Sequence, residues 1–109
     1  MNRGDIHWVR LPSRTPEGRE ITKTRPCIFV SATALNRHRS TILMVPLSTT
    51  ANKPHRPLSI PITATTKPSI AVCDQLLAVD KTRLGERLAT LSAAEQQDLN
   101  ESLRLILSL

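Results

Sequence analysis

The order of apolar and polar positions along the chain predicts several short strands followed by one helix. Apolar residues alternate with polar ones, or run together briefly, between loops rich in proline, glycine and charge, which is typical of strands. We expect strands over residues 4–10, 25–31, 41–47, 58–63, 69–73, 76–79 and 84–91. Ile6 and Trp8 share one face of the first strand. The second strand is apolar on both faces, which indicates a central place in a sheet.

The connections between these strands are polar. Residues 11–23 and 51–57 form charged loops, and the first is long for a structureless connection, which favours a functional role. Residues 33–40 are polar and have room for one helical turn. Pro46 stands inside the third strand, where a proline predicts a bulge or a sheet edge.

The last segment has the periodicity of a helix. Ser92 and Glu95 form a capping-box pattern, in which each side chain binds the backbone N–H of the other. Leu99, Leu103 and Ile106 follow at helical spacing and give one apolar stripe, so we expect a helix over residues 93–107. Many strands followed by one helix predict a single domain, residues 1–109: a small, curved sheet or barrel with a helix packed on it.

Charge divides the chain into two halves. The net charge of the 109 residues is +6, and residues 1–57 hold ten Lys or Arg against three Asp or Glu, whereas residues 58–109 hold five against six. The basic half is a candidate surface for a polyanion, and an ordinary solvated surface is the alternative. Trp8 and Phe29 are the only aromatic residues, which argues against a sheet that stacks bases on several rings.

Cysteine and histidine give no sign of a metal or a cofactor. Cys27 and Cys73 lie in apolar runs, and we expect them to be buried and reduced rather than joined. No Cys or His spacing matches a metal site, so we expect neither a metal nor a cofactor. No run is long and apolar enough to cross a membrane, and the first residues lack a signal-peptide core, so we expect a cytoplasmic protein without membrane contact.

Arg25 is the strongest candidate for chemistry. It precedes Pro26, which favours an extended backbone, at the entrance to an apolar strand. A guanidinium there can bind a phosphate through two parallel hydrogen bonds, and a structural ion pair is the alternative. Ser48 and Thr49 follow the third strand, where a hydroxyl can bind a phosphate oxygen or cap a turn. Glu20 is a candidate general base or an exposed ion pair. Asp74 is either an active carboxylate or the start of an Asx turn.

In order along the chain, these residues resemble the MazF/PemK family of toxin endoribonucleases. The resemblance extends from Arg3 to Leu109. It is carried by these motifs: Gly4-Asp5-Ile6-His7-Trp8-Val9, Thr24-Arg25-Pro26, Leu35-Asn36-Arg37, Val45-Pro46-Leu47-Ser48-Thr49, Cys73-Asp74-Gln75, Val79-Asp80 and Arg83-Leu84-Gly85.

The resemblance implies a mainly β protein with a C-terminal helix, an SH3-like small barrel of the CcdB/PemK type, that acts as a homodimer. It implies metal-independent, sequence-selective cleavage of single-stranded mRNA by its 2′-OH, which leaves 2′,3′-cyclic phosphate and 5′-OH ends and inhibits translation and growth. The implied catalytic residues are Arg25, Ser48 (where the family usually has threonine) and Glu20, with Thr49 and Asp74 as possible further members. The implied RNA contacts are Arg19, Lys23, Thr24, Asn36, Arg37, His38, Lys53, Arg56 and Gln75.

The resemblance also implies a cognate antitoxin, small, acidic and similar to MazE or PemI, with DNA contacted only through that antitoxin. Two alternatives stay open. A CcdB-like toxin binds DNA gyrase without catalysis and commonly has an aromatic C-terminal anchor, whereas this chain ends in Leu107-Ser108-Leu109. A degenerate barrel would bind RNA or antitoxin without cutting.

Overall fold

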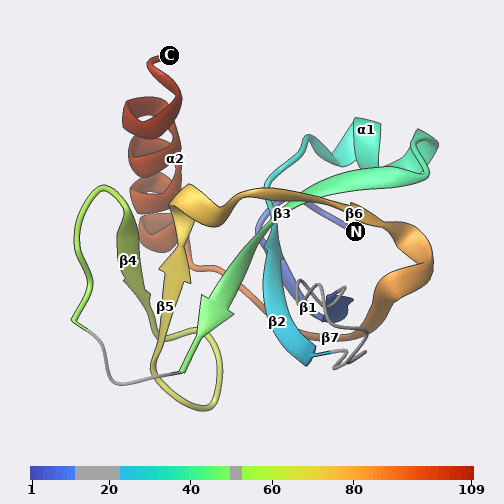
Figure 1. Ribbon diagram of the computed structural model, residues 1–109, viewed down its shortest axis with the longest axis horizontal. Coiled ribbons are helices and arrows are strands. Elements are labelled where there is room, and N and C mark those ends of the chain that lie inside the picture. The colour runs from blue at the N-terminus through green and yellow to red at the C-terminus, as the bar shows by residue number, and fades with distance from the viewer. Residues whose placement is uncertain (12–22, 50–52) are drawn as a thin grey trace, which may run out of the picture.

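The computed structural model describes residues 1–11, 23–49 and 53–109 and contains one antiparallel sheet with a long C-terminal helix (Figure 1). The elements in chain order are β1 (Asp5–Leu11), β2 (Lys23–Phe29), α1 (Thr33–His38), β3 (Thr41–Ser48), β4 (Ser59–Ile62), β5 (Ser69–Val72), β6 (Leu77–Asp80), β7 (Leu84–Thr90) and α2 (Ala93–Leu107). Two short 3-10 turns, η1 (Cys73–Gln75) and η2 (Lys81–Arg83), flank β6. Every predicted strand is confirmed with ends shifted by at most two residues, and the predicted helix matches α2.

The sheet curls into a small barrel with an outer hairpin. The strand order is β4-β5-β3-β2-β1-β7, and β6 pairs with β3 beside β5. In Figure 1 the segment from β6 through η2 to β7 curves round so that β7 lies against β1, while β4 and β5 extend beside α2. The predicted curved sheet or barrel with a packed helix is therefore confirmed.

β3 is the long strand that both parts share. On one side it pairs with β2, and on the other side it pairs first with β6 over residues 41–44 and then with β5 over residues 47–48. Pro46 lies in the gap between these two partners. The sequence predicted a bulge or a sheet edge at Pro46. The structure instead places it where β3 changes from one partner strand to the next. A residue without an N–H is tolerated there because no partner strand occupies that side of β3.

Apolar side chains are buried on both faces of the central strands. One cluster joins Ile6, Ile28 and Val45 to Leu99 and Leu103 of α2, and the other fills the barrel. The barrel cluster contains Val9, Cys27, Phe29, Ile42, Met44 and Val79. Because alternate residues of β2 enter different clusters, the central place predicted for this strand is confirmed. Burial of these side chains is the main favourable contribution to folding.

α2 is tied to the sheet at its first turn. The Ser92 hydroxyl accepts a hydrogen bond from the backbone N–H of Glu95, and the Glu95 carboxylate accepts one from the backbone N–H of Ser92, which confirms the predicted capping box. The other carboxylate oxygen of Glu95 accepts a 2.8 Å hydrogen bond from the backbone N–H of Thr63. One side chain therefore fixes both the helix terminus and the residue that follows β4.

Both cysteines are buried free thiols, as predicted. Burial raises the pKa of the Cys27 thiol to about 12, which the nearby Arg25 charge only partly offsets. Burial likewise raises the pKa of Cys73 to about 11, against a hydrogen bond with Ser102. Thiols with such pKa values are protonated at neutral pH and are poor nucleophiles.

Candidate functional site

Arg25 of β2 and Ser48 of β3 lie at the same end of two paired strands. The pairs Phe29↔Met44, Ile28↔Val45 and Cys27↔Pro46 advance one residue at a time. The β2–β3 pairing ends there, and Arg25 and Ser48 each lie two residues beyond the last pair. The side-chain alternation of strands then places both on the face of Cys27 and Pro46. The sheet thus places a guanidinium and a hydroxyl, 23 positions apart in the sequence, on one face at one end of these two strands.

Each of the two residues is held by a different outer neighbour. Arg25 pairs across β2 with Val9 of β1, whereas Ser48 pairs across β3 with Ile70 of β5. Both side chains are partly exposed, so a ligand can reach them. Strand alternation puts Arg25 on the face of Cys27 and Phe29, which belong to the barrel cluster. Since arginine stays protonated, this end of the barrel carries a permanent positive charge.

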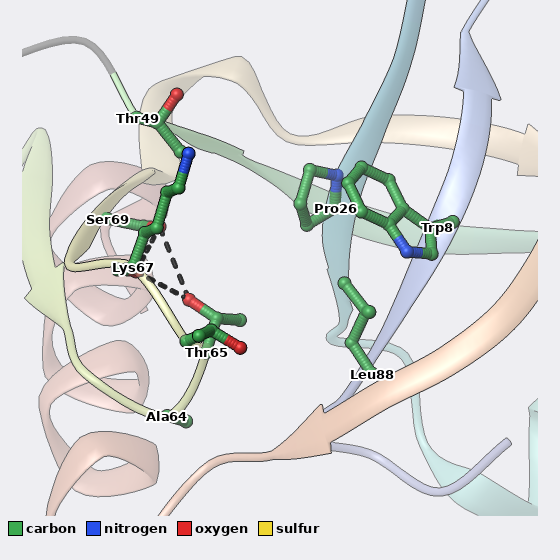
Figure 2. Close-up of a pocket in the computed structure, with 9 residues that line it drawn as sticks. Trp8, Pro26, Thr49, Ala64, Thr65, Lys67, Ser69 and Leu88 are labelled. Atoms are coloured by element: carbon green, nitrogen blue, oxygen red, sulfur yellow. Dashed lines mark hydrogen bonds between the residues drawn. The ribbon is translucent and has the colours of Figure 1, made fainter.

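Thr49 follows Ser48 but has a different neighbourhood. Thr49 is exposed and lines a pocket of about 450 Å³ together with Pro26, the residue after Arg25. This pocket lies between the Trp8 side of β1 and the loop that joins β4 to β5 (Figure 2). The strand alternation therefore separates the two hydroxyls. Ser48 is on the Arg25 face, and Thr49 belongs to the pocket.

Asp74 and Gln75 lie in η1, at the point where β3 changes partner. The pairs Leu47↔Ala71 and Met44↔Leu77 bracket this turn, so it lies beside residues 45–46 of β3. Both side chains are exposed. η1 also packs against α2 and β4, and the backbone N–H groups of Cys73 and Asp74 donate to Leu58 O. Both residues therefore lie beside the middle of β3, about two to three residues before Ser48.

Lys23 and Thr24 are exposed at the start of β2, next to Arg25. They are the predicted RNA contacts that the fold brings to the same strand end as Arg25 and Ser48. Lys53 is exposed shortly after β3 ends. Arg56 is also exposed and forms a 3.1 Å ion pair with Asp98 of α2. Such an exposed pair is weak, about 1 kcal/mol or less, so it leaves the Arg56 charge available to an anion.

Arg37 and His38 are not brought to this place. They are exposed on α1, which leads into β3 at Thr41, whereas Ser48 ends the same strand. At about 3.3 Å per residue, the two ends of β3 are roughly 23 Å apart. Within one protomer, RNA bound at Arg37 and His38 would lie far from the Arg25 strand end.

Asn36 departs from the prediction of an RNA contact. Its side chain is fully buried, and its amide group donates to Met1 O and to Ser31 O at 3.1 Å each. Its carbonyl oxygen accepts a short hydrogen bond from the Ser31 hydroxyl. Both amide protons and the carbonyl oxygen are bonded inside the chain, so Asn36 anchors the N-terminal residues to α1. Arg19 and Glu20, two further predicted site residues, lie outside the described residues.

The described ranges contain no group of three or more His, Cys, Asp or Glu side chains that could hold a metal ion. Within the same ranges, no helix has both the length and the apolar character needed to cross a bilayer.

Comparison with known families decides the identity of the chain. A sequence model of the family described as PemK-like, MazF-like toxin of type II toxin-antitoxin systems matches residues 2–107. The chain belongs to this family. Endoribonuclease MazF9 of Mycobacterium tuberculosis is 34% identical over 119 residues, covering 100% of this chain and 98% of that protein. Endoribonuclease MazF of Staphylococcus saprophyticus is 26% identical over 113 residues, covering 100% and 92%.

Solved structures of this toxin family have the same fold. An endoribonuclease from a mycobacterial species, in complex with its cognate antitoxin, aligns with a TM-score of 0.80 at 22% identity, covering 100% of this chain and 96% of that one. The MazE–MazF complex (Form-II) from Deinococcus radiodurans aligns with a TM-score of 0.81 at 18% identity, covering 100% and 96%.

The pocket of this PemK-like toxin was missed in the sequence. Trp8 was assigned to a strand face shared with Ile6, but Ile6 is fully buried while Trp8 is 38% exposed. The face is covered by α2 at Ile6 and opens into the pocket at Trp8. Lys67 and Ser69, on the opposite wall, belong to a loop that the sequence marks only by its Thr-Lys-Pro-Ser composition.

Proposed function

We propose that this PemK-like toxin is an endoribonuclease that cleaves single-stranded mRNA next to Arg25 and Ser48, and thereby inhibits translation and growth. The observation that carries the proposal is the β2–β3 pairing, from which Arg25 and Ser48 lie on one face, each two residues beyond the last pair. A fixed guanidinium and a hydroxyl on neighbouring strands suit the equatorial oxygens of a phosphate under attack.

RNA carries its own nucleophile, so no protein nucleophile is required. The 2′-OH attacks the adjacent phosphorus in line, a new O–P bond forms, and the bond from phosphorus to the 5′-oxygen breaks. The 2′-proton goes to a base, and the leaving 5′-oxygen takes up a proton. The products are a 2′,3′-cyclic phosphate and a 5′-OH end. Alignment of the two reacting oxygens and stabilisation of the extra negative charge are what the enzyme supplies.

Arg25 is best suited to hold the charge that develops on the phosphorane. Its guanidinium remains protonated at neutral pH, so it stabilises and donates hydrogen bonds rather than acting as the base. Ser48 donates a hydrogen bond to a non-bridging oxygen. Glu20 is the candidate base from the sequence resemblance, and Asp74 is a candidate supporting carboxylate.

The partners follow from the same family membership. We propose a homodimer, a cytoplasmic bacterial location, and a small acidic antitoxin that keeps the toxin inactive. The net charge of +6 favours association with an acidic segment and with RNA alike. DNA would be contacted only through the antitoxin, and the chemistry proposed here needs no cofactor.

The test is cleavage of a long single-stranded RNA in EDTA by purified wild type and by Arg25→Ala. We expect wild type to cut and to leave cyclic phosphate and 5′-OH ends. Arg25→Ala should not cut, although its circular dichroism spectrum should show that it is folded. Arg25→Lys keeps the charge but loses the forked donor, so an intermediate rate is expected. A folded wild type that cuts none of a varied set of RNAs would exclude the proposal and leave the gyrase-binding and non-cutting alternatives.

A further inference from the structure

The pocket beside the Arg25 strand end has two chemically different walls. Trp8, Pro26 and Leu88 form an apolar wall from three neighbouring strands, and Thr65, Lys67 and Ser69 form a polar wall from the loop between β4 and β5 (Figure 2). The volume of about 450 Å³ is within the range of small-molecule sites. Among the described residues that line it, none is acidic.

The apolar wall presents a flat aromatic face that is held in place. Trp8 pairs in register with Pro26 of β2, so the indole and the pyrrolidine ring lie side by side. Gly85 of β7 lies close to the Trp8 backbone and Cβ, since a Cβ atom added at Gly85 would lie 3.2 Å from Trp8 Cβ and 3.3 Å from Trp8 O. A supported and partly exposed aromatic ring is the usual platform for stacking a single-stranded base.

The polar wall is organised around the backbone of Lys67. The hydroxyls of Thr65 and Ser69 both donate to Lys67 O, at 2.8 and 3.1 Å. Because these protons are used in the loop, the half-buried Thr65 hydroxyl can offer a ligand its oxygen as an acceptor, which suits the N–H groups of a base edge, while the buried Ser69 hydroxyl, 3.4 Å from that of Thr65, supports the loop. The Lys67 side chain is exposed and extends toward Thr49, where its charge can meet a phosphate (Figure 2).

We propose that this pocket binds one nucleotide next to the scissile phosphate, with its base stacked on Trp8 and a flanking phosphate on Lys67. The inference rests on the proposed function and adds a subsite to it. Pro26 follows Arg25 and Thr49 follows Ser48, so the pocket and the proposed cleavage point share the ends of β2 and β3. An RNA chain with its scissile phosphate at Arg25 turns the neighbouring base round these strand ends into the pocket.

The single tryptophan of the chain makes the proposal directly measurable. The probe is a mixed-sequence pool of short 2′-O-methyl oligoribonucleotides, which cannot be cut because the 2′-oxygen is blocked. We expect saturable quenching of Trp8 fluorescence, and, for the tightest binder, loss of quenching when one position is made abasic. Binding of the probe by anisotropy without a change in Trp8 fluorescence would overturn the proposal, as would quenching that no abasic position affects.

Two variants of Trp8 distinguish base stacking on an aromatic ring from contact with any large apolar side chain. Trp8→Phe retains a ring and should bind the labelled probe nearly as well as wild type, whereas Trp8→Leu should bind roughly 5- to 150-fold more weakly, as expected for loss of one stacked base. Thermal melting of both variants serves as the folding control. Equal affinity of the folded Trp8→Leu variant would contradict the proposal.

Lys67 has a matched control in Lys81 of η2, which does not line the pocket. Lys67→Ala should lower the slope of log affinity against log salt by about 0.7, the value for one contact to a single strand, and Lys81→Ala should leave it unchanged. Equal slopes for Lys67→Ala and wild type would overturn the assignment of Lys67.

Two further outcomes distinguish this inference from the function on which it rests. If wild type cuts unmodified RNA but the probe does not change Trp8 fluorescence, the subsite is refuted and the endoribonuclease proposal stays intact. Quenching by an acidic peptide with an apolar side chain, but not by the oligoribonucleotides, would refute the nucleotide subsite in favour of a protein ligand.

Discussion

Glu95 of α2 and Thr63, the residue after β4, are joined by a 2.8 Å hydrogen bond from the Thr63 backbone N–H to the Glu95 carboxylate. The other oxygen of this carboxylate caps α2 through the backbone N–H of Ser92. One side chain therefore satisfies two N–H groups from separate elements.

Glu95→Ala should lower the free energy of unfolding by about 1–3 kcal/mol, because it leaves two backbone donors without their partner. Urea denaturation followed by circular dichroism measures this loss. Glu101→Ala is the matched control, since Glu101 is exposed on the same helix. An equal effect of the two substitutions would contradict the role given to Glu95.

Stability should also fall in acid. Burial raises the pKa of Glu95, but hydrogen bonds from Thr63 and Ser92 outweigh it and hold the pKa below the ordinary 4.5. Burial likewise raises the pKa of Asp5. Hydrogen bonds with Thr90 and Asn2, together with the nearby Arg87 charge, outweigh burial and hold this pKa below the ordinary 3.8. Depressed values mean that the ionised carboxylates stabilise the fold above their ordinary pKa.

This contribution is present at neutral pH and is lost as the pH falls through the depressed values. Urea midpoints measured over a series of decreasing pH values should fall less steeply for Glu95→Gln than for wild type, since the variant has no proton to take up at this position. Identical pH dependence in the two proteins would show that Glu95 does not contribute.

Ser48 and Thr49 should differ in kinetics because they face different surroundings. Ser48→Ala should lower kcat by about 10²–10³, the usual effect of removing one donor to a charged intermediate, and Ser48→Thr should restore it. Thr49→Ala should act mainly on KM, because Thr49 lines the pocket. Single-turnover cleavage of RNA resolves the two effects, and the reverse pattern would assign the catalytic hydroxyl to Thr49.

Asn36 should prove to be a stability residue. Asn36→Ala removes a buried amide that binds Met1 O, Ser31 O and the Ser31 hydroxyl, and should cost roughly 1–3 kcal/mol or more. Thermal melting should show a clear decrease, whereas exposed Arg37→Ala on the same helix should melt like wild type. A stable Asn36→Ala that loses affinity for RNA would restore the sequence-based prediction.

The fold was predictable because its signals are local. Strand alternation, the turn residues between strands and the Ser92–Glu95 capping box each depend on a few neighbouring residues, and each is confirmed. The sequence also favoured Arg25 and Ser48 one at a time. Their common face depends on the β2–β3 register, which is a long-range property and is not visible in either segment alone.

The features that the sequence did not reveal also depend on long-range packing. Asn36 resembles an RNA contact because its neighbours are basic, but packing of the N-terminal residues over α1 decides its burial. Trp8 shares a face with Ile6, but its exposure could not be predicted, because α2 covers that face only at the Ile6 end. Lys67 gave no signal, because the pocket forms only when the β4–β5 loop comes opposite β1 and β2.

The change of partner along β3 couples the spacing of the proposed catalytic groups to two separate parts of the sheet. Arg25 is anchored to β1 in the barrel, whereas the last pair made by Ser48 is with Ile70 of the outer hairpin. The distance between the cation and the hydroxyl therefore depends on how the outer hairpin, β4 and β5, is placed against the barrel.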